Sequence, residues 1–365
     1  MSKLFYNPKL SYKKNLENPP VIDHAAEFVG KPMIRLMGHK IYTPTGVAAG
    51  NLPDSNSIIA AVRAAACIVT YKTVGTRERP CHPFPNCVDI EEGPDPKNPW
   101  AHIIPGGTAI ATKKKTNTQT NSFGIPSISP YPNEKNNGWM ADVAIAQEYI
   151  DAHPGRMMIV SVVGTPSDTA EDKVEDLAND YALAGVLAQK AGARVIELNL
   201  SCPNVRADLG SIYQDYDMTS TIIKKTRNLI GDEIPLLIKV GYYEKENILH
   251  DVVEAALDAG VTGFIGINTI SMIINNADGT PALPGRTVSG VCGEGIQWYA
   301  RNWLKQMVYI RKAMGKQFII GSCGGIMTPN EFDSRLRDGA NLALAVTSMM
   351  KDPNIFINYS KRRIK

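Results

Sequence analysis

The sequence has few aromatic residues and almost no net charge, and each shortage excludes a class of protein. Phe, Trp and Tyr make up 7% of the 365 residues, while Gly and Pro number 30 and 24. This balance favours many short strand–helix connections over a helix bundle. Lys and Arg total 39 against 36 Asp and Glu. Composition therefore gives no reason to expect a nucleic acid or a membrane as a partner.

Cysteine is also scarce, and no long apolar run exists. The six cysteines form no CxxC pair, which predicts free thiols in a reducing, cytoplasmic compartment. Cys81, His82 and Cys87 lie close together, but no second ligand pair accompanies them, so no metal site is expected. The sequence lacks both a signal-peptide core and an apolar run of about 18 residues, so no membrane span is expected.

The chain alternates short apolar runs with longer amphipathic segments. Eight such runs favour an α/β fold, a (β/α)8 TIM barrel. An open doubly wound sheet is the alternative, which the count of eight and the lack of GxGxxG after the first strand disfavour. The expected strands are 46–49, 67–72, 158–163, 195–200, 236–240, 263–268, 318–321 and 342–346. The expected helices include 173–190, 219–230, 247–259, 296–314 and 329–338.

Two segments interrupt this alternation. Residues 1–41 are expected to form an N-terminal extension, and residues 42–365 the barrel. Segments 91–120 and 275–291 are rich in Gly and Pro and read as insertions. Because each follows a strand, the insertions are predicted to lie on the C-terminal, catalytic face of the barrel.

Polar residues gather where the predicted strands end. Asn199, Cys202 and Asn204 follow the fourth strand, Asn268 follows the sixth, and Asn121 lies in a loop before the third. A carboxamide offers both donors and an acceptor, so several together suit a small ring of alternating C=O and N–H groups. The thiol of Cys202 is a candidate proton acceptor near neutral pH.

Cations and glycines suggest an anion site at the same end of the barrel. Lys72 and Lys239 end two runs that read as buried strands, and buried lysine is rare without a partner. Gly324 and Gly325 follow the seventh strand, and the pair 347–348 (Thr-Ser) follows the eighth. Loops after these strands commonly hold phosphate in barrels. A phosphate-bearing cofactor is therefore expected.

These motifs resemble those of the class 1 dihydroorotate dehydrogenase family. The loop 197–204 (ELNLSCPN) resembles the family's catalytic loop, and 121–126 (NSFGIP) resembles its orotate-binding segment. Further resemblance lies in 71–89 and 319–326, in that order along the chain. The resemblance implies an FMN-binding barrel that oxidises dihydroorotate to orotate in pyrimidine biosynthesis.

The resemblance also implies roles for individual residues. Cys202 would be the general base that removes a proton while hydride passes to flavin N5. The implied substrate-binding residues are Lys72, Asn121, Phe123, Gly124, Ile125, Asn199, Asn204, Asn268 and Thr269. The implied cofactor-binding residues are Ala48, Ala49, Gly50, Lys72, Thr73, Ser161, Asn199, Lys239, Gly290, Gly324, Gly325, Thr347 and Ser348.

Some features depart from the class 1 pattern. The segment 44–50 is more like class 2, whereas class 2 has Ser where this chain has Cys202. Segment 277–287 resembles the pyrimidine domain of dihydropyrimidine dehydrogenase, so a dihydrouracil-type substrate stays an alternative. A tRNA dihydrouridine synthase-like reductase and a non-catalytic flavin scaffold are further alternatives. The first lacks a basic RNA-binding surface in this composition, and the complete set of polar residues disfavours the second.

The partners follow from the same resemblance. A homodimer is the expected assembly, and the small-molecule partner is dihydroorotate or orotate. The sequence has no NAD-binding fingerprint, so electrons would leave through a small molecule such as fumarate or through an electron-transfer subunit serving NAD. The sequence leaves the choice of acceptor open.

Overall fold

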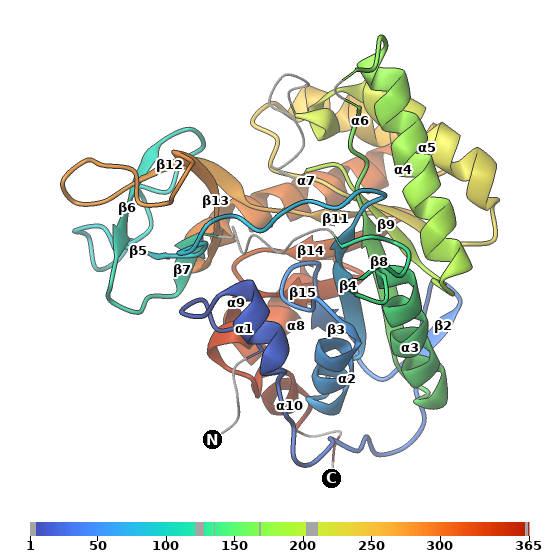
Figure 1. Cartoon of the computed structure of the whole chain (residues 1–365), viewed down its shortest axis with the longest axis horizontal. Helices are drawn as coiled ribbons and strands as arrows, with labels where there is room; N and C mark the ends of the chain where they lie inside the picture. Colours follow the sequence, from blue (N-terminus) through green and yellow to red (C-terminus); the bar gives the residue numbers. More distant parts are fainter. Residues whose placement is uncertain are drawn as a thin grey trace.

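The computed structural model describes residues 5–120, 128–134, 136–167, 169–201, 211–361 and 364. Within these residues, eight parallel strands close into a barrel, with helices around its outside (Figure 1). The strands follow one another around the barrel in chain order, which confirms the predicted (β/α)8 fold. They are β3 (Thr45–Val47), β4 (Ile68–Val74), β8 (Met157–Val162), β9 (Ile196–Asn199), β10 (Leu236–Lys239), β11 (Gly263–Gly266), β14 (Ile319–Cys323) and β15 (Leu342–Ala345).

The helices follow the expected periodicity and are capped by sequence-local signals. The predicted strands and helices all occur, with ends shifted by at most three residues. Asp172 caps α4 by accepting from the amides of residues 174 and 175, and Gly315 ends α7 in the left-handed conformation. The helices are α1 (Tyr12–Glu17), α2 (Ser55–Arg63), α3 (Trp139–Ala152), α4 (Lys173–Lys190), α5 (Tyr216–Ile230), α6 (Glu246–Asp258), α7 (Gln297–Met314), α8 (Pro329–Arg337), α9 (Thr347–Lys351) and α10 (Ile355–Ser360).

The barrel interior is a packed apolar core. Alternate residues of the barrel strands, among them Ile159, Leu237 and Leu344, pack into one buried cluster. The antiparallel pair β1 (Ile34–Leu36) and β2 (His39–Ile41) adds Leu36 and Ile41 to this cluster. Since Val195, just before β9, belongs to it too, the hairpin closes the N-terminal end and leaves the other end for the site.

A second, smaller sheet accompanies the main barrel and was not foreseen from the sequence. Five short strands close into a separate barrel that projects to one side of the molecule in Figure 1. These strands combine the two predicted insertions with their flanking residues. They are β5 (Asp89–Ile90), β6 (Thr108–Thr112), β7 (Thr118–Thr120), β12 (Ile270–Asn275) and β13 (Val288–Gly293).

The first described residues of the N-terminal extension pack near the C-terminal end of the barrel, away from the β1–β2 hairpin. Tyr6 is 1% exposed and packs with Cys87 and Met350, while Tyr12 and Val346 contact the same cluster. Burial raises the pKa of Tyr6 to about 12, although a hydrogen bond with the Asn86 side chain acts to lower it. No helix within the described residues is long and apolar enough to cross a membrane.

Candidate active site

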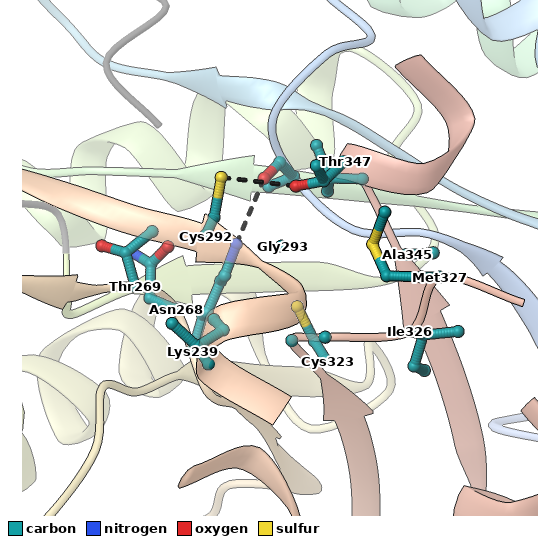
Figure 2. Close-up of a pocket in the computed structure, with 15 residues that line it drawn as sticks. Lys239, Asn268, Thr269, Cys292, Gly293, Cys323, Ile326, Met327, Ala345 and Thr347 are labelled. Carbon is teal, nitrogen blue, oxygen red and sulfur yellow. Dashed lines mark hydrogen bonds between the residues drawn. The ribbon is translucent and has the colours of Figure 1, made fainter. Parts of the chain in front are cut away.

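An open pocket with about 420 Å³ of empty space lies at the C-terminal ends of β10, β11, β14 and β15 (Figure 2). This is the end of the barrel where active sites of the fold are found. The pocket brings together seven of the residues predicted from the sequence. They are Ala49, Lys239, Asn268, Thr269, Gly324, Gly325 and Thr347.

The loop after β14 fits an anion. Gly324 and Gly325 adopt φ angles of 105° and 73°, and a Cβ on Gly325 would lie 2.5 Å from Cα of Gln297. Glycine is therefore required there. The amides of Gly324, Gly325 and Ile326 have no acceptor among the described residues. Successive backbone N–H groups in a turn can form a concave nest that holds an anion such as phosphate.

The segment after β15 supplies the Thr347 hydroxyl to the same pocket and carries a second hydroxyl at Ser348. Thr347 begins α9, lines the pocket and donates from Oγ1 to Sγ of Cys292 at 3.3 Å (Figure 2). Ser348 follows it, is 1% exposed, and has an Oγ with no partner among the described residues. A buried hydroxyl without a partner is unfavourable, so a ligand that accepts its hydrogen bond would be stabilised.

Lys239 brings a buried positive charge to the pocket. It ends β10, is 3% exposed, and donates from Nζ to the carbonyl of Ala49 at 3.2 Å (Figure 2). It takes part in none of the ion pairs among the described residues. An ammonium group buried without a carboxylate partner favours an anionic ligand.

A fully buried carboxyl group lies within the electrostatic reach of Lys239. Glu197 on β9 is 0% exposed, and neither of its carboxylate oxygens has a partner within hydrogen-bond distance and angle among the described residues. Burial raises the pKa of Glu197, and the Lys239 charge and the nearby Ser161 hydroxyl oppose the rise. Burial also raises the pKa of Cys323, which lines the pocket, and Lys239 again opposes the rise.

Three buried side chains connect neighbouring strand ends near the pocket. Asn199 donates from Nδ2 to Oγ1 of Thr73 at 3.0 Å, and Thr73 shares a 2.9 Å hydrogen bond with the Ser161 hydroxyl. Tyr181 on α4 donates to the carbonyl of Asn199 at 2.8 Å. These bonds fix the Asn199 carboxamide before any ligand binds.

Asn268 anchors the start of the loop that carries the predicted base. Its Nδ2 donates to the carbonyl of Ser201 at 2.9 Å and to the Ser201 hydroxyl at 3.1 Å. Ser201 also donates to the carbonyl of Lys239 at 3.2 Å. Gly290 lies against Thr269, since a Cβ there would come 2.1 Å from the Thr269 hydroxyl.

Eight of the predicted residues that the structure describes lie outside the lining of this pocket: Ala48, Gly50, Lys72, Thr73, Ser161, Asn199, Gly290 and Ser348. Lys72 is half-buried on β4, with its Nζ 3.3 Å from the carbonyl of Thr73. Ala48 packs in the barrel interior. Gly50 is buried against Val346, a pocket residue that would lie 3.0 Å from a Cβ at position 50.

Part of the predicted site lies outside the described residues. This holds for the predicted base and for much of the predicted substrate contact, so the corresponding assignments stay predictions. The residues concerned are Asn121, Phe123, Gly124, Ile125, Cys202 and Asn204.

The five described cysteines are free thiols. Cys87 and Cys292 are buried, and burial raises the pKa of Cys292 to about 11. In the described part of the chain, no group of three or more His, Cys, Asp and Glu residues could hold a metal ion.

Several pocket residues were missed from the sequence. Cys292 and Gly293 end β13 of the small barrel, and their contribution depends on how that barrel meets the main one. The family resemblance includes segment 290–293, but only Gly290 was predicted from it as a site residue. The remaining residues, mostly apolar, carry no chemical signature. They are Ile296, Cys323, Ile326, Met327, Ala345 and Val346.

The fold and the pocket define a (β/α)8-barrel protein whose site at the strand ends suits an anionic ligand. A family model described as dihydroorotate dehydrogenase matches residues 33–362. The chain belongs to this family of oxidoreductases of pyrimidine synthesis, whose members typically bind FMN.

Similarity to individual proteins supports the family membership. The chain is 34% identical to "Dihydroorotate dehydrogenase" of Dictyostelium discoideum, over 98% of this chain and 97% of the relative. It is 28% identical to "NAD-dependent dihydropyrimidine dehydrogenase subunit PreA" of Escherichia coli (strain K12), over 62% of this chain and 51% of the relative. It is 25% identical to "Dihydroorotate dehydrogenase B (NAD(+)), catalytic subunit" of Desulforudis audaxviator, over 54% of this chain and 58% of the relative.

Proposed function

We propose that the protein is an FMN-dependent dihydroorotate dehydrogenase of class 1 that oxidises dihydroorotate to orotate. The observation that carries the proposal is the buried Lys239 in a pocket beside a glycine nest. It is supported by the full-length similarity to a dihydroorotate dehydrogenase. The Cys202 in the loop 197–204 supports class 1 rather than class 2.

The described residues fit FMN. The nest at 324–326 and the unpaired Ser348 hydroxyl match a phosphate, which accepts hydrogen bonds from several donors. The buried Lys239, which forms none of the ion pairs among the described residues, matches the negative charge that a reduced flavin carries. When bound, FMN would supply the acceptor for the hydride that leaves C6 of dihydroorotate.

The chain would supply the proton chemistry and the binding of the pyrimidine. Cys202 would remove the proton from C5, in the role of general base. Asn199 and Asn268, with Asn121 and Asn204, would pair with the ring C=O and N–H groups. Lys72, with the backbone of 123–125, would hold the carboxylate.

Two observations favour a second substrate class. The similarity to PreA, together with segment 277–287, favours a dihydropyrimidine without the carboxylate, such as dihydrouracil. Lys72 on β4 would supply a positive charge for the carboxylate of dihydroorotate, a group that dihydrouracil lacks, and this supports dihydroorotate over dihydrouracil.

Flavin content and reduction test the proposal. Acid treatment of the purified protein should release a non-covalent yellow compound with the mass of FMN. Under anaerobic conditions dihydroorotate should bleach the bound flavin, and dihydrouracil should bleach it at least about 100-fold more slowly, given the lost charge pairing. Faster bleaching by dihydrouracil would instead establish the second substrate class, and a protein that stays colourless with added FMN would refute the flavin assignment.

The electron acceptor and the assembly belong to the same proposal. We expect a cytoplasmic homodimer that passes electrons to fumarate or, through an electron-transfer subunit, to NAD. Reoxidation of the bleached protein by fumarate, NAD and a quinone, followed in a stopped-flow instrument, distinguishes these acceptors. Fast reoxidation by the quinone alone would contradict class 1.

A further inference from the structure

Arg335 is a buried cation directly behind the glycine nest. It lies on α8, is 0% exposed, and donates from Nη2 to the carbonyl of Gly324 at 2.9 Å. Its Nε and Nη1 have no acceptor among the described residues. It belongs to none of the ion pairs within the described part of the chain. A buried guanidinium with two unused donors is costly unless an anion compensates for it.

The acidic groups near Arg335 are occupied elsewhere. Glu331 accepts from the amide of Thr328 at 2.9 Å and from the side chain of Gln297, and so it caps α8. Asp338 pairs with Arg301 at 3.1 Å. Burial, and next the Arg301 charge, lower the pKa of Arg335 to about 10, with Glu331 opposing. Arg335 nevertheless stays charged at neutral pH, because that pKa is well above 7.

The position of Arg335 affects both the shape and the charge of the pocket. By binding the Gly324 carbonyl, it directs that oxygen toward α8, a helix outside the pocket lining. The carbonyl of Gly325 is held in the same way by Nε2 of Gln297 at 3.1 Å. With both carbonyls occupied, the amides of 324–326 are the groups left for a ligand. The Arg335 charge also acts on Cys323 in the pocket wall.

We propose that Arg335 is a positioning residue for the phosphate of the flavin, which shapes the nest at 324–326 and supplies the charge that the phosphate balances. The proposal rests on the proposed FMN function. It predicts that Arg335 contributes to the binding of FMN but not to that of riboflavin, which has the same ring system without the phosphate.

The experiment compares the two flavins on the full-length, flavin-free protein. Dissociation constants for FMN and riboflavin are measured by quenching of flavin fluorescence. In Arg335→Met, the preference for FMN over riboflavin should fall by about tenfold or more, the scale of a lost interaction with a charged group. Arg335→Lys keeps the charge but loses the planar guanidinium group that binds the Gly324 carbonyl. Its preference for FMN over riboflavin should therefore fall by a factor between those of the wild type and Arg335→Met.

Arg301→Met is the matched control. It removes the same charge from a partly exposed residue that is paired with Asp338, and it should leave the preference within about twofold of the wild type because exposed pairs contribute little. An equal loss of affinity for FMN and riboflavin in Arg335→Met would show a structural role and overturn the proposal. So would an unchanged preference.

If Arg335→Met fails to fold, Arg335→Lys provides the test. An unchanged preference for FMN over riboflavin in that variant also overturns the proposal. The wild type separates this test from the proposed function. If the wild-type protein binds neither flavin, the FMN assignment fails. If the wild type binds FMN tightly and the Arg335 variants keep the same preference for FMN over riboflavin, only the role of Arg335 is refuted.

Discussion

The Asn199 carboxamide donates to the Thr73 hydroxyl at 3.0 Å and so joins β9 to β4 across β8. Ser161 on the intervening strand hydrogen-bonds with the same hydroxyl at 2.9 Å. All three side chains are buried. The barrel itself therefore sets the orientation of a side chain that we propose binds both flavin and pyrimidine, and ligand binding need not order it.

Thr73→Val tests this arrangement. Valine has the shape of threonine but leaves the Asn199 Nδ2 and the Ser161 hydroxyl without their shared partner. Orotate should bind to the flavin-loaded variant about tenfold more weakly, because a buried unpaired polar group costs ~1–3 kcal/mol. Perturbation of the flavin absorbance by orotate gives the dissociation constant.

Thr219→Val is its control. Thr219 is buried on α5 and donates to the carbonyl of Ile212 at 3.0 Å. The variant should lose a comparable part of its free energy of unfolding without a change in orotate affinity. Equal orotate affinity in Thr73→Val and wild type would contradict the proposed role of Asn199.

Gly325→Ala should abolish tight FMN binding. Its φ of 73° disfavours a side chain, and the new Cβ would lie 2.5 Å from Cα of Gln297, a backbone atom that cannot move away freely. The nest must distort, so FMN affinity should fall by more than about tenfold. Fluorescence titration of the flavin-free protein measures it.

Gly315→Ala provides the comparison. Gly315 ends α7 with a φ of 62°, and no atom lies within 4 Å of a Cβ built there. It should cost about 1 kcal/mol of unfolding free energy and leave FMN affinity unchanged. A similar loss of FMN affinity in both variants would show that backbone strain alone, and not the nest, controls binding.

Glu197→Gln should change the pH dependence of stability. Burial raises the pKa of Glu197 above its ordinary 4.5, so the folded protein keeps a proton that the unfolded chain has lost. This group's stabilising contribution is complete below pH 4.5 and is lost as pH rises through the raised pKa. Glutamine cannot lose a proton.

The free energy of unfolding of Glu197→Gln, minus that of the wild type, should therefore increase with pH above 4.5. Urea unfolding of the flavin-free proteins at several pH values measures this difference. Glu175→Gln, which alters a half-exposed carboxylate paired with Lys225, should show no such increase. A difference that is flat or falls with pH would mean that Glu197 is ionised in the folded protein.

Cys202→Ala tests the proposed base. FMN should remain bound, because the nest and Lys239 are untouched. Reduction of the flavin by dihydroorotate should slow by roughly 10²–10⁴-fold, the usual contribution of general acid–base catalysis. Cys202→Ser should keep partial activity with its pH profile shifted upward, since a hydroxyl ionises less readily. Single-turnover reduction at the wild-type rate in Cys202→Ala would make Cys202 a structural thiol.

The sequence by itself determined the barrel and located seven of the residues that line its pocket. Eight apolar runs with helical segments between them predicted the strands within a few residues, because buried parallel strands and amphipathic helices have distinct periods. The residues Lys239, Asn268, Gly324 and Thr347 could be found because each lies at the end of a strand or within two residues after it, and strand ends meet at one end of a barrel.

The tertiary structure decided what depends on contacts distant in sequence. The insertions pair with one another as a five-stranded barrel, and β7 pairs with β13 although more than 160 residues separate them along the chain. That pairing brings Cys292 into the pocket. The sequence pattern does not single out Arg335. Only the packing of α8 on the nest shows it buried and bound to Gly324, because local periodicity does not encode which loop a side chain reaches.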